Sequence, residues 1–359
     1  MTIKTGKIYR HEHKQYTNYA YRACSNAFDL VFELSNNILR QLISLDSLAC
    51  LDSLIWLQTG KEVAKRFSYN QSTVCRQQKS CCEILGISLI KDNKEWIIDQ
   101  PNELIRMERL VHQQARFQGL RTLRMEATYW SAPLLCQPVP EGWILGLSNI
   151  VGIKRNHQLL REGIIDAWLC SAPDLPDYDD PDLTSIQLCK MPVHLIVGKN
   201  HPLLRKGTSI RWDDLADLPS LGLPDGAYPK TQSTLEKLGL WKSPVRMSRY
   251  KVNLWEGQTE EDLTIGYGTC LSILASKTDA MKLPLTLPLN SGEALVVRHE
   301  YKNHPKLQEL IHLIKQRLME ITTAENSIQL INDKKAEVTQ ERASQAKTTK
   351  RSIMGYIDD

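Results

Sequence analysis

Apolar residues recur at helical spacing between about residue 45 and residue 85. They first form a stripe along a predicted helix that ends near Gln58, and the stripe consists of Leu45, Leu48, Leu51 and Ile55. Thr59 and Glu62 then have the spacing of a Thr-x-x-Glu capping box, which predicts the start of a helix of barely two turns. We expect the buried face of this short helix to consist of Val63, Ala64 and Phe67.

A longer helix is predicted after the turn at residues 68–70. Asn70 is a suitable N-cap for it, and its apolar face consists of Val74, Cys81 and Leu85. The other face is largely polar and holds Gln71, Ser72, Arg76 and Lys79. Gly86 ends the helix, and residues 87–98 predict a two-stranded wing around the polar segment 91–94. Together these elements predict a winged helix-turn-helix domain over residues 46–98.

The charge of this region favours nucleic acid as a partner. One acid, Glu62, lies between residues 59 and 80, together with five cations: Lys61, Lys65, Arg66, Arg76 and Lys79. Cations at the edges of such helices neutralise phosphates, and polar residues at the start of the longer helix offer hydrogen bonds to base edges. An ordinary helical hairpin with a basic, solvated face is the alternative that this pattern leaves open.

Residues 54–90 resemble the DNA-binding domain of LysR-type transcriptional regulators. The family pattern runs Ser-Gln-x-x-Val-Ser-Arg-x-Ile and later Leu-Gly-x-x-Leu-Phe, and the residues in step with it are Gln71, Val74, Arg76, Leu85-Gly86 and Leu89-Ile90. Asn70 and Cys75 replace the two usual serines. The resemblance implies a regulator that binds specific sequences of double-stranded DNA. We expect its DNA-binding residues to be Lys61, Lys65, Gln71, Ser72, Thr73, Arg76, Lys79, Lys91 and Lys94.

The next helical pattern opens at Pro101 and closes at Gly119. It has an apolar stripe, formed by Leu104, Met107, Val111 and Ala115, and a charged remainder that includes Arg106, Glu108, Arg109 and Arg116. Taken alone, the pattern is typical of a surface helix packed on its own domain. The family resemblance implies instead that residues 99–119 form a linker helix, which pairs with its twin to give a homodimer or homotetramer.

Short apolar strands alternate with helical segments from Leu120 to about Leu318, which is typical of an α/β sheet. Three motifs follow in the order of the LysR family: Leu160-x-x-Gly163-x-Ile165-Asp166, His201-Pro202-Leu203 and Ile265-Gly266-Tyr267-Gly268. The resemblance implies the two-lobed effector domain of the type II periplasmic-binding-protein kind. We therefore expect an α+β multidomain chain, with an effector-binding domain over residues 120–320. Lobe I is expected at about 120–188 and 264–320, and lobe II at about 189–263.

The same resemblance implies that a small-molecule effector binds in the cleft between the lobes. Strand ends, backbone N–H groups and helix N-termini converge in such a cleft. By analogy, the effector-binding residues are expected to be Thr128, Tyr129, Ser148, Asn149, Ser171, Leu223, Asp225 and Gly226. Between the first strand and Trp143 the chain is short and holds three prolines, where the family has a long helix. A regulator that has lost effector binding is therefore an alternative.

Composition narrows the other possibilities. The 359 residues include 45 Lys and Arg against 41 Asp and Glu, a net charge of +4, so the distribution of charge must decide what the protein binds. Nine cysteines without Cys-x-x-Cys spacing argue against a disulfide framework and against a zinc site. The sequence shows neither an apolar stretch of membrane-spanning length nor a secretory signal. We expect a reduced, cytoplasmic protein without a membrane partner.

The sequence contains no activated-nucleophile motif, phosphate loop or paired metal ligands. We therefore predict no catalytic residues, no metal site and no cofactor, and the protein is not expected to be an enzyme. A solute-binding protein of the same two-lobed fold is a further alternative, although the basic N-terminal domain counts against it. Residues 1–45 are expected to form a mostly helical extension, and residues 321–359 a disordered or loosely helical tail.

Overall fold

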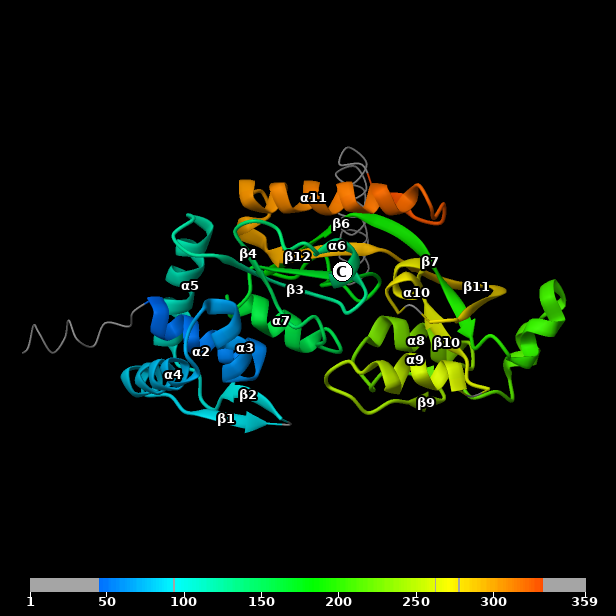
Figure 1. Ribbon diagram of the computed structural model, residues 1–359, viewed down its shortest axis with the longest axis horizontal. Helices are drawn as coiled ribbons and strands as arrows, with labels where there is room; N and C mark the ends of the chain where they lie inside the picture. Colours follow the sequence, from blue (N-terminus) through cyan, green and yellow to red (C-terminus); the bar gives the residue numbers. More distant parts are fainter. Residues whose placement is uncertain (1–44, 93, 262, 277, 332–359) are drawn as a thin grey trace, which may run out of the picture.

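The computed structural model describes residues 45–92, 94–261, 263–276 and 278–331. It has the expected fold class, in which a winged helix-turn-helix domain and a connecting helix precede two α/β lobes. Figure 1 shows the helical domain at one end of the molecule and the second lobe at the other. The predicted N-terminal extension (except Leu45) and the predicted tail beyond residue 331 lie outside the described residues. Among the described helices, none is both long and apolar enough to cross a membrane.

The N-terminal domain follows the predicted order of elements. These are α2 (Leu45–Leu57), α3 (Gly60–Phe67), α4 (Gln71–Leu85), β1 (Leu89–Asp92) and β2 (Glu95–Ile98). The Thr59 hydroxyl accepts the N–H of Glu62 at 3.2 Å, as a capping box requires, but the Glu62 carboxylate binds Arg66 instead of returning to Thr59. Asn70 occupies the N-cap of α4 without a side-chain hydrogen bond. Gly86 ends this helix with a positive φ of 64°, a conformation that glycine adopts without strain.

Helix α2 is buried on nearly every side. Apart from the partly exposed Ala49, its apolar residues from Leu48 to Leu57 are each at most 8% exposed. The apolar core that contains them includes residues of α3 and α4 and, from the first lobe, Leu159, Leu160 and Trp168. A helix with neighbours on both sides needs apolar residues all round, which explains why its burial exceeds the single stripe expected from periodicity.

Helix α5 (Glu103–Phe117) connects this domain to the lobes, and it buries two of the charged residues that lie outside its apolar stripe. Arg109 and Arg116 are each 3% exposed, whereas Leu104, Met107 and Val111 of the apolar stripe are 50–62% exposed. The buried cations are paired, because Arg109 binds Asp52 and Glu162, and Arg116 binds Asp166. The apolar stripe is consequently free for a contact outside the described chain.

The first lobe is built on a five-stranded sheet of order β4-β3-β5-β12-β6. Its strands are β3 (Leu123–Ala127), β4 (Trp143–Leu145), β5 (Ala167–Ser171), β6 (Leu183–Gln187) and β12 (Glu293–Arg298). β3 pairs in parallel with β4 and β5, and β12 runs antiparallel to β5 and β6. A short helix, α6 (Ser131–Leu135), stands where the LysR pattern has a long one.

Helices cover both faces of this sheet. Figure 1 shows α7 (Lys154–Arg161) on one side and α11 (Pro305–Thr322) on the other. Alternate residues of β5 divide between the two sides: Trp168 and Cys170 share a core with α7 and the N-terminal domain, and Ala167 and Leu169 share a core with α11. The turn η3 (His299–Tyr301) leads from β12 into α11. The sheet therefore separates two apolar cores.

The second lobe is organised around the long strand β7 (Cys189–Val197). Strands β10 (Gly266–Gly268), β11 (Met281–Ser291) and β13 (Gln329–Leu330) pair antiparallel with β7. The remaining elements are η1 (Pro202–Ser209), η2 (Trp212–Leu215), β8 (Leu221–Gly222), α8 (Pro229–Lys237), β9 (Ser243–Pro244), α9 (Val252–Glu261) and α10 (Cys270–Ser276).

Two expected boundaries need correction. The chain rejoins the sheet of lobe I at Glu293, not at residue 264, because β10 and β11 extend the sheet of lobe II. The loose tail does not start at residue 321, because α11 continues to Thr322 and β13 pairs with the start of β7. Ile328 is 6% exposed, so an apolar anchor holds this polar segment in place.

Candidate DNA-binding surface and ligand cavity

Helix α4 has one face anchored in the core and one face open to solvent. Val74, Cys81, Cys82 and Leu85 are at most 9% exposed and pack in the core shared with α2. On the other side Gln71, Ser72, Arg76 and Lys79 are exposed, and Thr73 is half-buried. All five residues expected on this helix thus gather on its outer surface, where their polar groups are available to a partner.

The four remaining residues expected to bind DNA lie on α3 and on the wing. Lys61 and Lys65 are exposed on α3, and Lys91 and Lys94 are exposed at the tip of the wing. The Lys91 ammonium lies 4.8 Å from the centroid of the Trp96 ring, a cation–π distance that supports its position. The nine predicted residues therefore belong to the surface of a single domain.

A buried hydrogen bond fixes this domain on lobe I. The indole N–H of Trp56 on α2 donates to the Glu126 carboxylate on β3 at 2.7 Å, and neither side chain is exposed. Burial raises the pKa of Glu126. Hydrogen bonds from Trp56, Ala127 and Ser148 act in the opposite direction and lower this pKa. Beside this pair, Arg66 of α3 donates to the carbonyl oxygens of Leu145 and Gly146 at 3.0 and 3.2 Å.

A second set of contacts joins the wing to both lobes. Arg249 of lobe II donates to both carboxylate oxygens of Glu95 on β2, at 2.7 and 2.6 Å. Arg155 of α7 donates to the carbonyl oxygens of Ile55 and Trp96 at 2.9 and 3.0 Å. Planar, two-pronged arginine contacts hold a carboxylate in a defined geometry. The wing is thereby connected directly to the part of lobe II that follows β9.

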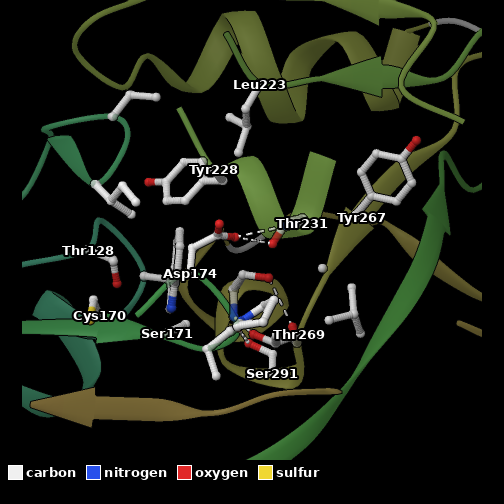
Figure 2. Close-up of a pocket in the computed structure, with 18 of the residues that line it drawn as sticks. Thr128, Cys170, Ser171, Asp174, Leu223, Tyr228, Thr231, Tyr267, Thr269 and Ser291 are labelled. Carbon is white, nitrogen blue, oxygen red and sulfur yellow. Dashed lines mark hydrogen bonds between the residues drawn. The ribbon is translucent and has the colours of Figure 1, made fainter. Parts of the chain in front are cut away.

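A cavity of about 120 Å³ lies between the two lobes. A volume of this size is similar to that of cavities that hold a benzene-sized molecule. Figure 2 shows polar side chains from several elements around it, among them Thr128, Ser171, Thr231, Thr269 and Ser291. Most of the remaining lining is aromatic or aliphatic, including Trp130, Trp168, Tyr228, Trp241, Tyr250, Trp255 and Tyr267.

Four of the eight predicted effector-binding residues line this cavity: Thr128, Tyr129, Ser171 and Leu223. The other four lie outside it. The backbone N–H of Ser148 donates to Glu126, and the Asn149 side chain accepts from Arg249. Asp225 and Gly226 are exposed and interact with Gln232. These four residues remain predictions from the resemblance, which placed polar strand-end turns at the cleft.

Apart from Tyr129, the aromatic lining was missing from the sequence prediction. Tyr250 is the clearest example, since its ring stacks on Tyr129 with centroids 3.4 Å apart and an interplanar angle of 7°. Tyr250 comes from the irregular segment between β9 and α9, which carries no motif. The only available signal was the aromatic pair Tyr129-Trp130 directly after a predicted strand, where a binding residue is expected.

The polar groups of the cavity are largely held by the protein itself. Asp174 accepts the backbone N–H groups of Lys230 and Thr231 at the start of α8, and also the Thr231 hydroxyl. Buried Glu293 accepts from Trp130, Ser131 and Ser171 at 2.6–3.0 Å, and burial raises its pKa. Among the described residues, the cavity lining includes no Lys, Arg or His. The acidic Asp174 is thus the one charged side chain in the described lining, and it is hydrogen-bonded to α8.

The family comparison agrees with this architecture. Residues 153–319 match the family described as "LysR substrate binding domain". The matched segment begins just before α7 and ends within α11, so it contains the greater part of both lobes. No curated protein sequence matches the chain significantly.

Solved structures of complete regulators resemble the chain at low sequence identity. A probable transcriptional regulator from Pseudomonas aeruginosa has a TM-score of 0.50 and 14% identity, covering 78% of this chain and 98% of that one. A full-length OxyR variant from the same organism has values of 0.49 and 17%, with coverages of 76% and 95%. A full-length BenM variant has values of 0.44 and 20%, with coverages of 81% and 99%.

The fold is thus a winged helix-turn-helix that precedes a two-lobed α/β domain. More specifically, residues 153–319 match the LysR substrate binding domain, and the chain as a whole has a LysR-type fold, as the sequence resemblance implied.

Proposed function

We propose that the protein is a sequence-specific DNA-binding transcriptional regulator whose affinity for its operator is set by a small molecule. The exposed polar face of α4 is the observation that carries this proposal. Gln71, Ser72 and Arg76 lie at the start of a helix whose apolar side is fixed in the core. Recognition helices of this kind contact base edges through the residues of their first turns.

The exposed stripe on α5 supports a homodimer, or a homotetramer built from such dimers. Leu104, Met107 and Val111 form an apolar strip that the described chain leaves uncovered. Two copies that pair along this helix would bury the strip, and the gain grows with the apolar area removed from water. Pairing also supplies two recognition helices, as half-sites one helical turn apart or a multiple of it require.

The cavity supports regulation by an effector, in preference to a regulator that has lost its ligand. Tyr250 lines the cavity, and its neighbour Arg249 binds Glu95 of the wing. The backbone N–H of Tyr250 also donates to Asn149 of lobe I at 2.6 Å. A ligand that displaces the Tyr250 ring also moves the segment that holds the wing. Such a ligand has different affinities for the protein with the wing held and with the wing released, and it therefore shifts the balance between these two states.

The lining favours an uncharged, aromatic-sized effector, and matched ligand pairs test this. Thermal unfolding is measured with benzyl alcohol or benzamide and with benzoate at equal concentrations. A neutral compound that binds raises the melting temperature by mass action, and benzoate should have a smaller effect. In the variant Leu223→Trp the larger side chain fills the cavity, and this variant is expected to show no increase in melting temperature with any of the compounds. A consistently greater effect of carboxylates would contradict the proposed ligand class.

DNA binding is tested first by the sequences of DNA fragments that co-purify with the protein. Fragments that share one motif are expected for a specific regulator, and the binding constant should fall steeply with salt because bound phosphates release counterions. A solute-binding protein, the competing candidate, would retain no DNA. Its binding to added duplex would also depend little on salt.

A further inference from the structure

A groove with a basic lining lies where the N-terminal domain meets lobe II. Its volume is about 850 Å³. Thr59, Lys61 and Glu62 line it from the start of α3, and Lys94 and Glu95 from the wing. The segment between β9 and α9 forms the opposite wall with Arg246, Met247, Ser248, Arg249 and Lys251. Figure 1 shows the wing and β9 on the same side of the molecule.

The groove has an excess of positive charge that the protein does not neutralise. Both acids that line it are engaged, since Glu62 binds Arg66, and Glu95 binds Arg249. The other cations of the groove are Lys61, Lys94, Arg246 and Lys251, and all four are exposed. Within the described part of the chain, no ion pair is found for any of them. Four charges are thus available to an anionic partner.

The wall from lobe II is held in place on its inner side. Met247 is 9% exposed, and Tyr250 stacks on Tyr129. The backbone is also fixed, because the N–H of Val151 donates to the Ser248 carbonyl oxygen at 3.2 Å and Ile150 forms a β-bridge with Arg249. Arg246 and Lys251 are therefore presented by an anchored segment, at a defined distance from the wing.

The start of α3 and the wing border the same groove. In helix-turn-helix proteins the second helix enters the major groove while the first crosses the sugar–phosphate backbone. Helix α3 is that first helix, and its start at Thr59 and Lys61 is part of the groove. The path of a sugar–phosphate backbone across the start of α3 would therefore border the groove that Lys94 also lines. Lobe II borders the same path with two further cations.

We propose that lobe II takes part directly in DNA binding, with Arg246 and Lys251 contacting phosphates of the strand that runs beside the wing. This inference rests on the proposed function, because it assumes that α4 binds duplex DNA. It extends that function by assigning DNA contacts to the ligand-binding half of the chain. The Tyr250 ring at the cavity belongs to the same segment, so effector binding and phosphate binding share one structural element.

The test is the salt dependence of DNA binding by the double variant Arg246→Ala/Lys251→Ala. The probe is a duplex selected by the full-length wild-type protein from a random-sequence pool. Each lost phosphate contact lowers the slope of log K against log salt by about 0.9, so the slope should fall by about 1.8. The sequence preference should stay unchanged, because phosphate contacts carry no base information.

The matched control is Arg205→Ala/Lys237→Ala, which removes the same charge from exposed positions of lobe II outside the groove. Its slope should equal that of the wild type. All variants alter exposed side chains, and their melting temperatures verify that they are folded. A slope in Arg246→Ala/Lys251→Ala equal to the control overturns the proposal while the wild type still binds DNA.

Two other outcomes also overturn the proposal. If the wild type selects no duplex, the proposed function fails and this inference fails with it. If tripolyphosphate binds the wild type but not the groove variant, and the DNA slope is unchanged, the groove is a site for a small polyanion. A hydroxyl-radical footprint gives an independent measurement. The length of DNA backbone protected beside the wing should be shorter with Arg246→Ala/Lys251→Ala than with the wild type or the control variant.

Discussion

Trp56 and Glu126 form a fully buried hydrogen bond between two domains. The indole Nε1–H donates to Oε2 of the carboxylate at 2.7 Å, and Oε1 accepts the backbone N–H of Ser148 at 2.6 Å. The partners lie on α2 of the N-terminal domain and on β3 of lobe I. An unpaired buried carboxylate is costly, so this bond fixes the orientation of the N-terminal domain on lobe I.

Glycine at position 146 is required by this contact. A Cβ there would lie 2.0 Å from Oε2 of Glu126 and 2.8 Å from Nε1 of Trp56. Forcing extra volume into a packed core costs about 1–3 kcal/mol, and we expect Gly146→Ala to lower the free energy of unfolding by about 3 kcal/mol in a denaturant titration. The control is Gly257→Ala on α9, where the new Cβ meets only ordinary contacts at 3.8 Å. Equal stabilities of the two variants would contradict the close approach.

The wing contact to lobe II is tested by a double-mutant cycle. Glu95→Gln and Arg249→Gln should each destabilise the protein, and the double variant should lose less than the sum. The ion pair is two-pronged, and its side chains are only 17% and 18% exposed. We therefore expect a coupling energy of about 1–3 kcal/mol. Arg246→Gln paired with Glu95→Gln serves as a control and should show additive effects. A coupling near zero for Glu95 and Arg249 would mean that the wing is not held there.

Two buried histidines should make the protein less stable in acid. Burial lowers the pKa of His112 and of His157 to about 4, from the ordinary value of 6.5. The unfolded chain takes up protons on these rings below about pH 6.5 while the fold keeps them neutral, so stability is lost as the pH falls from 6.5 to about 4. The shift corresponds to about 3 kcal/mol for each ring.

The variant His157→Phe isolates this effect, since it keeps an aromatic ring against Trp168. Its stability relative to the wild type should improve by about 3 kcal/mol between pH 6.5 and pH 4, measured by urea unfolding at each pH. The wild type and the variant share all other titrating groups. A difference that stays constant over this range would show that His157 is not buried in the neutral form.

The exposed apolar stripe of α5 predicts a dimer that a single charged substitution in the stripe disrupts. Met107 is 56% exposed at the centre of the stripe, and Met107→Glu should convert the dimer to a monomer in sedimentation experiments. Met319→Glu makes the same change at an exposed methionine of α11, where 48% of the residue is accessible. That control should retain the assembly of the wild type. Dissociation of both variants, or of neither, would place the interface elsewhere.

The parts of the fold that depend on local signals could be predicted from the sequence. Thr59 caps the start of α3, Gly86 ends α4, and the apolar residues of α4 repeat along one face. Such signals act over a few residues, so one chain is enough to detect them. The strand ends after β3 and β5 likewise indicated Thr128 and Ser171, both of which line the cavity.

The remainder depends on pairings between distant residues. Arg109 is buried because Asp52 and Glu162, 57 and 53 positions away, neutralise it. No periodic pattern reveals such partners, so the sequence did not predict that Arg109 and Arg116 are buried. The same reason applies to Tyr250, which reaches Tyr129 from across the cleft. Its place in the cavity follows from the meeting of two lobes and not from a motif.

The most direct test of the central claim is the affinity of the wild type and of Arg76→Ala for a selected duplex and for its scrambled counterpart. The wild type should prefer the selected duplex by at least about 10³-fold. Arg76→Ala should lose about 1–3 kcal/mol of binding free energy on the selected duplex and relax the preference at one position, because an arginine that reads a base carries that much discrimination. Equal binding of both duplexes by the wild type, or an affinity unchanged in Arg76→Ala, would contradict the assignment of α4 as the recognition helix.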